Sequence, residues 1–408
     1  MQTALKAEPA PARAALGSVV LAAAAVAAIG MGMRQVIGLY MKPVTQDLGF
    51  AREIFALSVA IANIVWGLAA PCAGFIADRF GAGRVVIMGG LSTAAGLTLM
   101  SIATSEWHLL LAGALMGLGV AGAGINALMG TAGRSVAPEN RTRAIAAIGM
   151  GSGIGMLLAL PYTHLLIDFA GWQISLLVLA ATALFILPLA VPVSGKPDPT
   201  TSENPQGAMS ALREAASHRD FWLLNLGFFV CGFHVVFYAT HLPAYVADQG
   251  MSPWIAVAAL TLVGVGNLVG TWLAGEWGRR RPKQNGLAII YAARAAVFLL
   301  FLALPPSPAV VLGASAALGL LWLSTVPLTS GLVATFFGPR WMTMLYGIAF
   351  FSHQAGSFLG VWLAGRIFDQ YGSYDAMWWI CVALGLFAAA INLPIRDRAL
   401  GRSVLQGA

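Results

Sequence analysis

GMGMRQVIGLYMKP, residues 30–43, places a charged side chain, Arg34, inside the first long apolar run of the chain. An arginine at membrane depth costs about 2.5–3.5 kcal/mol, so it is expected to face protein or a watery cavity. The same stretch recurs 200 positions later as VCGFHVVFYATHLP (230–243), where Gly232 matches Gly32 and His234 matches Arg34. A polar residue at the same place in a repeated apolar segment predicts two related halves around a shared polar interior.

The composition excludes a soluble domain. Of the 408 residues, 59% are hydrophobic and only 10% are charged, whereas soluble domains carry about 25% charged residues. The apolar residues form about twelve runs of roughly 20–27 residues, each long enough to cross a hydrocarbon core of about 30 Å. Their Ala, Leu and Gly content is typical of closely packed helices rather than barrel strands. The predicted fold class is an all-α membrane protein with twelve transmembrane helices in two pseudo-symmetric six-helix bundles.

A polar, Pro-rich segment divides the chain. SGKPDPTTSENPQG (194–207) is typical of a linker, and AMSALREAASHRDFW (208–222) is typical of a short amphipathic helix on the membrane surface. We therefore expect an N-terminal bundle (1–193), a cytoplasmic linker (194–219) and a C-terminal bundle (220–408). The expected helices are 16–41, 54–77, 84–103, 108–131, 143–167, 173–193, 220–246, 254–277, 285–304, 308–330, 342–368 and 374–394.

The distribution of positive charge predicts the orientation. Lys and Arg collect in alternate loops, and the loops of the other side hold only Lys42, Arg52 and Arg366. By the positive-inside rule both termini are cytoplasmic, which predicts a multi-pass protein of the cell (inner) membrane. The net charge of +7 is therefore not a nucleic-acid signal. We expect a monomer in the lipid bilayer.

No pattern in the sequence indicates an enzyme. There is no nucleophile elbow, no phosphate loop and no Cys/His cluster with metal-ligand spacing, so neither catalytic residues nor a metal nor a cofactor is predicted. The three cysteines, Cys72, Cys231 and Cys381, fall in different apolar runs, so no disulfide framework is predicted.

The loop after the second helix, GFIADRFGAGR (74–84), carries a motif with a degenerate counterpart in LAGEWGRRR (273–281). With two six-helix halves and a long central loop, this motif resembles the major facilitator superfamily over essentially the whole chain. The resemblance implies a major facilitator fold and a conformational latch, a charge network between helices with glycines for close approach and a tight turn. The latch residues would be Gly74, Asp78, Arg79, Gly81 and Arg84.

Three further stretches narrow the resemblance. RQVIGLYMKPVTQDLGFAR (34–52), FYATHLPAYVADQGMS (237–252) and GIAFFSHQAGSFLGVWLAGRIFDQYGSY (347–374) resemble bacterial monocarboxylate-porter and oxalate/formate-type transporters. The resemblance implies a small organic anion as substrate. That group often has an arginine in the eighth helix, where this chain has Asn267 and Gly270. This difference argues against assigning to this chain the second carboxylate clamp of that group.

The substrate-binding candidates start with Arg34, whose guanidinium presents forked donors that match a carboxylate. The alternative is a structural arginine bonded to backbone carbonyls. His234, Tyr238 and His241 are spaced i, i+4 and i+7, which places them on one helix face. We expect Tyr238 to hydrogen-bond the substrate and a histidine to bind a proton, since its unperturbed pKa is near 6.5.

The remaining candidates are polar or aromatic residues on helices expected to line the cavity. His353 and Gln354 interrupt the eleventh helix and would bind substrate or proton, or bond to neighbouring helices. Buried Ser and Thr more often bond the carbonyl four residues back. This set also contains Asn126, Trp322, Ser324 and Thr325. For Arg294, in the ninth helix, we expect a structural bond to a neighbouring carbonyl or to Tyr291.

The placement of the acidic residues completes the functional prediction. All 16 Asp and Glu residues lie in loops or near helix ends, so the interior is expected to be electropositive and to suit anions. We predict a secondary active transporter that moves a small organic anion, a monocarboxylate, by alternating access with coupling to H⁺ through His234, His241 or His353. The alternatives are an exporter or exchanger of another small metabolite or drug, and a membrane sensor that does not transport.

Overall fold

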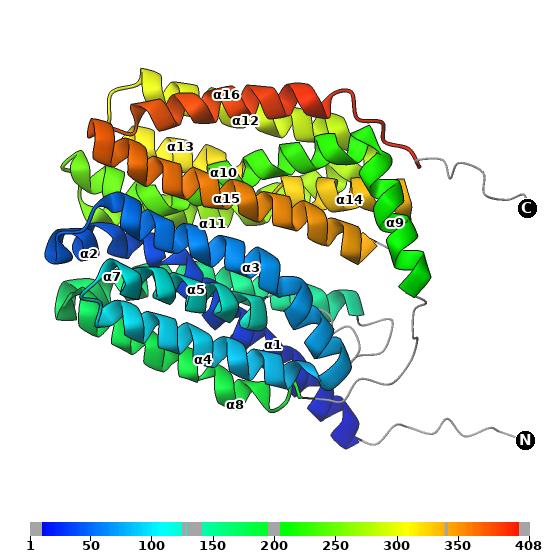
Figure 1. Cartoon of the computed structure of the whole chain (residues 1–408), viewed down its shortest axis with the longest axis horizontal. Helices are drawn as coiled ribbons and strands as arrows, with labels where there is room; N and C mark the ends of the chain where they lie inside the picture. Colours follow the sequence, from blue (N-terminus) through cyan, green and yellow to red (C-terminus); the bar gives the residue numbers. More distant parts are fainter. Residues whose placement is uncertain (1–9, 125–127, 129–140, 195–204, 339–341, 400–408) are drawn as a thin grey trace, which may run out of the picture. The chain divides into compact units, whose positions relative to one another are not determined.

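The computed structural model describes residues 10–124, 128, 141–194, 205–338 and 342–399, and all its regular elements there are helices (Figure 1). Ten helical spans among the described residues, some of them made of consecutive helices, are long and apolar enough to cross a membrane, which agrees with the predicted class. The helices are α1 (Ala10–Gln35), η1 (Ile37–Tyr40), α2 (Met41–Leu48), α3 (Arg52–Phe80), α4 (Ala82–Ser101), α5 (Glu106–Ala123), α7 (Arg141–Leu184), α8 (Ile186–Ala190), α9 (Pro205–Ser217), α10 (Arg219–Asp248), α11 (Pro253–Arg280), α12 (Lys283–Ala303), α13 (Pro308–Leu321), α14 (Thr325–Phe337), α15 (Met342–Tyr371) and α16 (Asp375–Asn392).

The contacts within the chain define two compact units. The first contains residues 1–36, 68–102 and 114–198, and the second contains residues 37–67, 103–113 and 199–408. Helices α3 and α5 contribute to both units. The second unit therefore includes residues 37–67 from the first half of the sequence together with α10 to α16.

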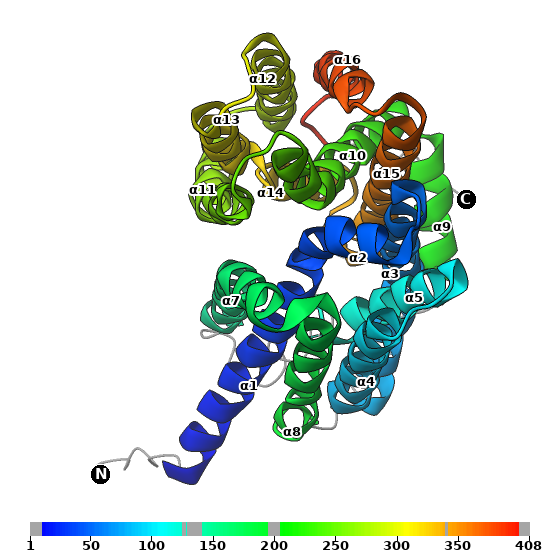
Figure 2. The same ribbon diagram turned by 90° about the vertical axis from the view of Figure 1, so that its left-hand side faces the viewer.

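In the first unit, α1 packs on α7, and α4 packs on α7 and α8 (Figure 2). Small residues allow this approach, since a Cβ atom at Gly155 of α7 would overlap the carbonyl oxygen of Ala28 of α1. The long helix α7 bends at Gly171, which has a positive φ of 79°. The bend separates the two segments that the sequence predicted as individual helices, 143–167 and 173–193.

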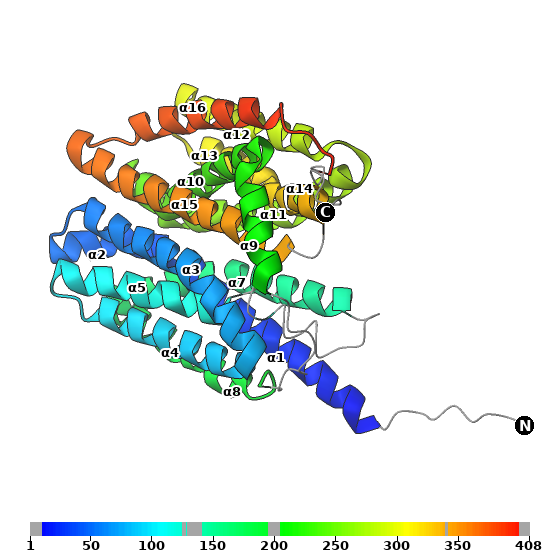
Figure 3. The same ribbon diagram turned by 45° about the vertical axis from the view of Figure 1, so that its right-hand side comes forward.

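In the second unit, α10 packs on α15, α11 on α13 and α12 on α16 (Figure 1). The α10–α15 contact is again backbone against backbone, since a Cβ atom at Gly356 would overlap the carbonyl oxygen of Phe229. Residues 208–217 of the predicted amphipathic segment lie in α9, which runs across the direction of α10, while its last four residues begin α10 (Figure 3). The indole Nε1 of Trp222 donates to the Ala216 carbonyl (2.8 Å), which fixes the turn between α9 and α10.

The sequence repeat extends to the backbone conformation. Gly49 and Gly250, which are 201 positions apart, both have φ of 69°, and Gly171 and Gly372, at the same offset, have φ of 79° and 68°. These left-handed values favour glycine. The helix contacts repeat as well, because Gly155 with Ala28 corresponds to Gly356 with Phe229, again at an offset of 201.

Two predicted helices are interrupted. The segment predicted as 16–41 consists of α1, which ends at Gln35, followed by η1 and α2. The segment predicted as 308–330 is broken, because α13 ends at Leu321 and α14 begins at Thr325. The side-chain Oδ1 of Asn267 accepts the Leu323 N–H (3.0 Å) inside this break. A side chain thus replaces the backbone partner that a continuous helix would supply.

The glycine contact in α15 gives a test of this packing. We expect Gly356→Ala to destabilise the protein by about 1–3 kcal/mol, because its Cβ meets the rigid carbonyl of Phe229. Gly347→Ala in the same helix is the control, since nothing lies within 4 Å of its Cβ position. Denaturant unfolding of the purified protein measures both. Equal effects of the two substitutions would contradict the backbone-to-backbone contact.

Candidate functional site

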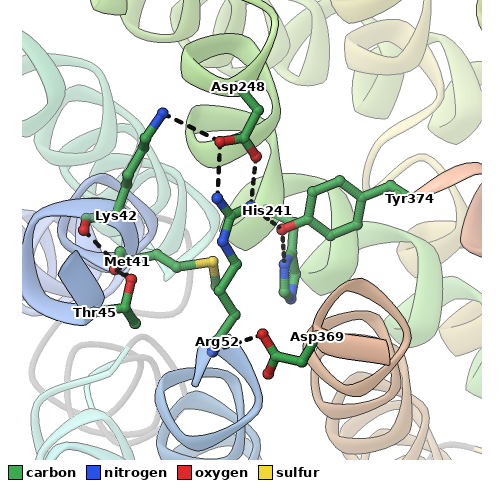
Figure 4. Close-up of polar contacts among 8 residues, drawn as sticks. All are labelled: Met41, Lys42, Thr45, Arg52, His241, Asp248, Asp369 and Tyr374. Atoms are coloured by element: carbon green, nitrogen blue, oxygen red, sulfur yellow. Dashed lines mark hydrogen bonds and ion pairs between the residues drawn. The ribbon is translucent and has the colours of Figure 1, made fainter. Parts of the chain in front are cut away.

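The start of α3 is held by an aspartate from α15. The backbone N–H groups of Arg52 and Glu53 donate to Asp369 Oδ1 (3.1 Å) and Oδ2 (2.6 Å). The first N–H groups of a helix have no partner within the helix, so a carboxylate at this place caps it. Residues more than 300 positions apart in the sequence, in α3 and α15, are therefore joined (Figure 4).

The side chain of Arg52 forms a two-pronged ion pair with Asp248, the last residue of α10. Its Nη1 and Nη2 atoms donate to the two carboxylate oxygens of Asp248 at 2.5 and 2.8 Å. Lys42 Nζ lies 3.1 Å from Asp248 Oδ1, and the guanidinium stacks 3.7 Å from the ring centre of Phe368. Forked charge-assisted bonds of this kind are stronger than neutral hydrogen bonds and fix orientation (Figure 4).

A hydrogen-bond chain continues from Arg52 to His241. Arg52 Nη1 donates to the hydroxyl of Tyr374 (3.1 Å), which lies 3.0 Å from His241 Nδ1, and His241 Nε2 lies 2.9 Å from the Val361 carbonyl. Burial raises the pKa of Tyr374 although the Arg52 charge beside it acts in the opposite direction. The hydroxyl therefore keeps its hydrogen and donates it.

We call this set the clasp, and it consists of Lys42, Arg52, His241, Asp248, Asp369 and Tyr374 (Figure 4). It is flanked by Glu53, which accepts from Trp362 Nε1 (2.9 Å) and pairs with Arg366 (3.5 Å). Apart from His241, none of these residues was a predicted site residue. The sequence did contain an indication of these residues. Lys42, Arg52 and Arg366 are the few cations in the loops on the side of the membrane with little positive charge, and acidic residues lie near them in the sequence.

A second polar centre surrounds Arg294, which is 1% exposed. Its Nε and Nη2 donate to the Leu321 carbonyl (3.2 and 2.6 Å), and Nη2 also donates to the Trp322 carbonyl. These oxygens lie at the end of α13, where the helix break leaves carbonyls without helical partners. The predicted structural bond from Arg294 to a neighbouring carbonyl is confirmed.

Three buried atoms near this centre have no hydrogen-bond partner among the described residues. They are Arg294 Nη1, Tyr291 Oη and His234 Nδ1. The Arg294 guanidinium lies 5.6 Å from the Tyr291 ring centre, and its Nη2 is 3.5 Å from Cys231 Sγ. His234 uses its other nitrogen, Nε2, on the Cys381 carbonyl (3.0 Å). The centre therefore keeps hydrogen-bonding capacity in the interior of the second unit.

The three predicted residues of α10 are all buried, but they have different partners. His241 belongs to the clasp, His234 contacts α16, and the Tyr238 hydroxyl lies 2.7 Å from Ser315 Oγ of α13. Tyr238 also contacts Trp322, with ring centres 6.0 Å apart. The structure thus places Tyr238 and Trp322 together and His241 apart from them.

Most of the other predicted site residues form hydrogen bonds with protein groups close to them. His353 Nδ1 lies 3.0 Å from Gln354 Oε1, and Gln354 Nε2 donates to the Asn63 carbonyl (3.2 Å). Ser324 donates to the Leu320 carbonyl four residues back (2.7 Å), as buried serines commonly do. Thr325 Oγ1 lies 3.1 Å from Cys231 Sγ.

Arg34 lies in the last turn of α1, half-buried, and Asn126 lies outside the described residues.

Among the latch residues, Gly81 has φ of 90° in the turn between α3 and α4. Arg79 and Arg84 are exposed and lie 5.4 and 5.9 Å from the Phe80 ring centre. No Cβ contact lies within 4 Å of Gly74, and the side chain of Asp78 lies outside the described set. The latch role stays a prediction. The three cysteines are free thiols, as predicted.

Repeated helices of membrane length, charged helix ends that join distant segments, and buried cations are the features of a polytopic membrane protein. The Major Facilitator Superfamily model matches residues 20–361, and the chain belongs to that superfamily. Monocarboxylate transporter 11 of Mus musculus is 28% identical over 402 residues, covering 93% of this chain and 88% of the relative. The uncharacterized MFS-type transporter YcxA of Bacillus subtilis (strain 168) is 24% identical over 391 residues, covering 91% and 93%.

The fold is similar to that of solved transporters. A bacterial homolog of the human lysosomal transporter Spinster, crystallised in an inward-facing and unoccupied conformation, has a TM-score of 0.71 with 17% identity over 95% of each chain. An inward-facing and occupied structure has a TM-score of 0.76 with 16% identity over 96% of this chain and 99% of that one. At these identities the likeness concerns the fold alone.

The ion pair between Arg52 and Asp248 is expected to be energetically coupled. We predict a coupling of about 1–2 kcal/mol in a double-mutant cycle of Arg52→Ala and Asp248→Ala, because the pair is forked and partly shielded, with side chains 12% and 23% exposed. The pair Arg279 with Glu276, with side chains 67% and 35% exposed, is the control at about 0.3–0.5 kcal/mol. Unfolding of the purified variants measures both. A coupling no larger than the control contradicts the interpretation.

Removal of the buried guanidinium is expected to weaken the broken helix. Arg294→Met leaves the carbonyls of Leu321 and Trp322 without their donor, and we predict a loss of about 2–5 kcal/mol. Arg213→Gln, at an exposed position of α9, should change stability by less than about 0.5 kcal/mol. Thermal unfolding in detergent compares the two. If Arg294→Met does not change the stability, other donors must hydrogen-bond the carbonyls at the helix break.

Proposed function

We propose that this chain is a secondary active transporter that moves a small organic anion, a monocarboxylate, across the membrane by alternating access together with H⁺. Its similarity to monocarboxylate transporter 11 over 93% of the chain supports the substrate class. The observation that carries the proposal is the sign of the charge in the membrane interior.

The described interior contains cations and histidines without carboxylates. Arg34 lies in the interior of the membrane-length span Gly17–Leu48 and Arg294 within α12, whereas every Asp and Glu among the described residues lies near a helix end, beside the Gly171 bend, in α9 or in a loop. A positively charged interior favours an anionic substrate. We propose Arg34 as the carboxylate clamp, because a guanidinium presents two parallel donors to a carboxylate.

The centre around Arg294 supports an anion path in the C-terminal half. Arg294 Nη1 has no partner among the described residues, although its other nitrogens are used at the helix break. A buried donor of this kind gains most from an acceptor brought by a ligand. Tyr238 and Trp322, which lie nearby in α10 and at the break, would provide a hydroxyl and an apolar wall.

The clasp supports the alternating-access part of the proposal. It joins residues 42–53 of the first sequence half to α10, α15 and α16 of the second half, all at one end of the second unit. A transporter of two related halves opens to that side only when such contacts separate. With both termini in the cytoplasm, as the positive charges predict, the clasp would close the side away from the cytoplasm.

Uptake by proteoliposomes tests the proposal. With lactate as a radiolabelled short monocarboxylate, we expect Arg34→Ala to lower uptake about 10- to 100-fold because a charge-assisted bond to the carboxylate is lost. Arg34→Lys should restore part of the uptake, since lysine keeps the charge but not the fork. A proton gradient directed into the proteoliposomes, with the outside more acidic than the inside, should stimulate wild-type uptake. A protonophore should abolish this stimulation.

The exposed Arg213→Gln variant is the matched control for loss of a positive charge and should transport as wild type does. Wild-type uptake no higher than that of empty liposomes, or full uptake by Arg34→Ala, would refute the proposed function. Thermal stabilisation by organic cations rather than carboxylates would favour an exporter of drugs. Stabilisation by carboxylates without flux would favour a sensor.

A further inference from the structure

The hydrogen bonds around His241 can run in only one direction. The Val361 carbonyl can only accept, so His241 Nε2 carries a hydrogen and donates across 2.9 Å. In the neutral ring Nδ1 is then an acceptor, and it receives the Tyr374 hydroxyl hydrogen across 3.0 Å. The Tyr374 oxygen in turn accepts from Arg52 Nη1. The closed clasp is therefore complete with a neutral His241.

A protonated His241 does not fit this arrangement. Both ring nitrogens of an imidazolium carry hydrogens, so Nδ1–H would face a hydroxyl that already accepts from Arg52 and donates toward the ring. The Tyr374 hydrogen would need another acceptor. A second cation would also lie across Tyr374 from the Arg52 guanidinium. The hydrogen-bond geometry and the charge both oppose protonation while the clasp is closed.

The two carboxylates of the clasp are already used by other cations or donors. Asp248 binds Arg52 and Lys42, and Asp369 accepts the first N–H groups of α3. Among the described residues, the polar partners of His241 are Tyr374 and Val361. The charged or titratable groups on the elements around it include Tyr40 of η1, Lys42 and Asp47 of α2, Arg52 and Glu53 of α3, Tyr245 and Asp248 of α10, Arg366, Asp369 and Tyr371 of α15, and Tyr374 and Asp375 at the start of α16.

We propose that His241 is the proton-binding site of this transporter and that protonation of its Nδ1 opens the clasp. This inference rests on the proposed function, which requires an H⁺ site without naming it. Among the three histidines predicted for that role, His234 bonds a carbonyl of α16 and His353 bonds Gln354, and neither belongs to the clasp. Of these three histidines, only His241 is connected to the contacts that must separate.

Linkage determines the sign of the effect. The closed clasp binds the proton on His241 more weakly than the open form, in which the ring meets water, so closing releases a proton and acid favours opening. The closed form is therefore favoured above the ordinary titration range of histidine and is lost as the pH falls through it. Acid on the clasp side would open that side to substrate. Closing requires the proton to leave His241, and in H⁺-coupled transport it must leave toward the substrate path, because its return to the clasp side would carry no H⁺ across the membrane.

Spin labels on the two sides of the clasp measure its opening. Gln46 of α2 and Gln249 at the end of α10 are exposed and belong to the same unit. Both are changed to cysteine in a Cys72→Ser background, since Cys231 and Cys381 are 0% exposed. In nanodiscs, electron–electron resonance of the full chain should show the short-distance population falling by about half between about pH 8 and about pH 5.

The decisive variant is His241→Gln, whose amide nitrogen can still donate to the Val361 carbonyl but which does not titrate. We expect its distance distribution to be independent of pH. His234→Gln is the matched control, because it changes another buried histidine of α10 bonded through Nε2 to a carbonyl, and it should keep the pH response of the wild type. Tyr374→Phe keeps the bond to Val361 but removes the link to Arg52, and should reduce the response by at least about half.

A pH response that persists in His241→Gln, or one that disappears in His234→Gln while His241→Gln retains it, would overturn the proposal. So would a wild-type distance distribution that does not change with pH. If His241→Gln does not fold, an unchanged response in Tyr374→Phe would also overturn it. The measurement requires no substrate, so its failure differs from a failure of the proposed function, which appears as missing carboxylate uptake.

Discussion

A helix in a membrane can break only where other groups satisfy its backbone, because lipid offers no hydrogen-bond partners. The break between α13 and α14 meets this requirement with two side chains. Arg294 donates to the carbonyls of Leu321 and Trp322, and Asn267 accepts the N–H of Leu323. The cost of burying Arg294 is offset by these bonds, and the broken segment exposes Trp322 toward Tyr238 of α10. The polar interior of the second unit depends on this substitution of side chains for backbone.

Close contact between backbones holds the repeated helix pairs together. In both α1–α7 and α10–α15, a glycine lies against a carbonyl of the partner helix, at positions related by the same offset. Membrane helices associate through close packing rather than through the hydrophobic effect, so glycine at these points determines how closely the axes approach. The chain varies what each pair carries, since at this offset Arg34 on α1 corresponds to Val235 on α10, next to His234. The repeat thus conserves the packing geometry between halves and changes the chemistry.

Much of the fold could be predicted from sequence because its determinants are local. The amino-acid sequence itself contains the apolar runs of membrane length, the linker at 194–207 and the glycines at repeated offsets. The helix break was missed because its stabilising groups are remote, with Arg294 28 positions from Trp322 and Asn267 56 positions from Leu323. The clasp was missed for the same reason, since Arg52 and Asp248 are 196 positions apart. His241 was identified as a titratable residue of a polar helix face, but its partners Tyr374 and Val361 could not be read from that pattern.

The cap that Asp369 provides to α3 has a mechanical consequence. Opening the clasp removes this carboxylate from the N–H groups of Arg52 and Glu53, and loss of an N-cap costs about 0.5–2 kcal/mol. The first turn of α3 is then free to unwind, so separation of the two sides is coupled to a local helix–coil transition. Part of the energy that keeps the clasp closed is therefore the stability of the first turn of α3, in addition to the attraction between the paired charges.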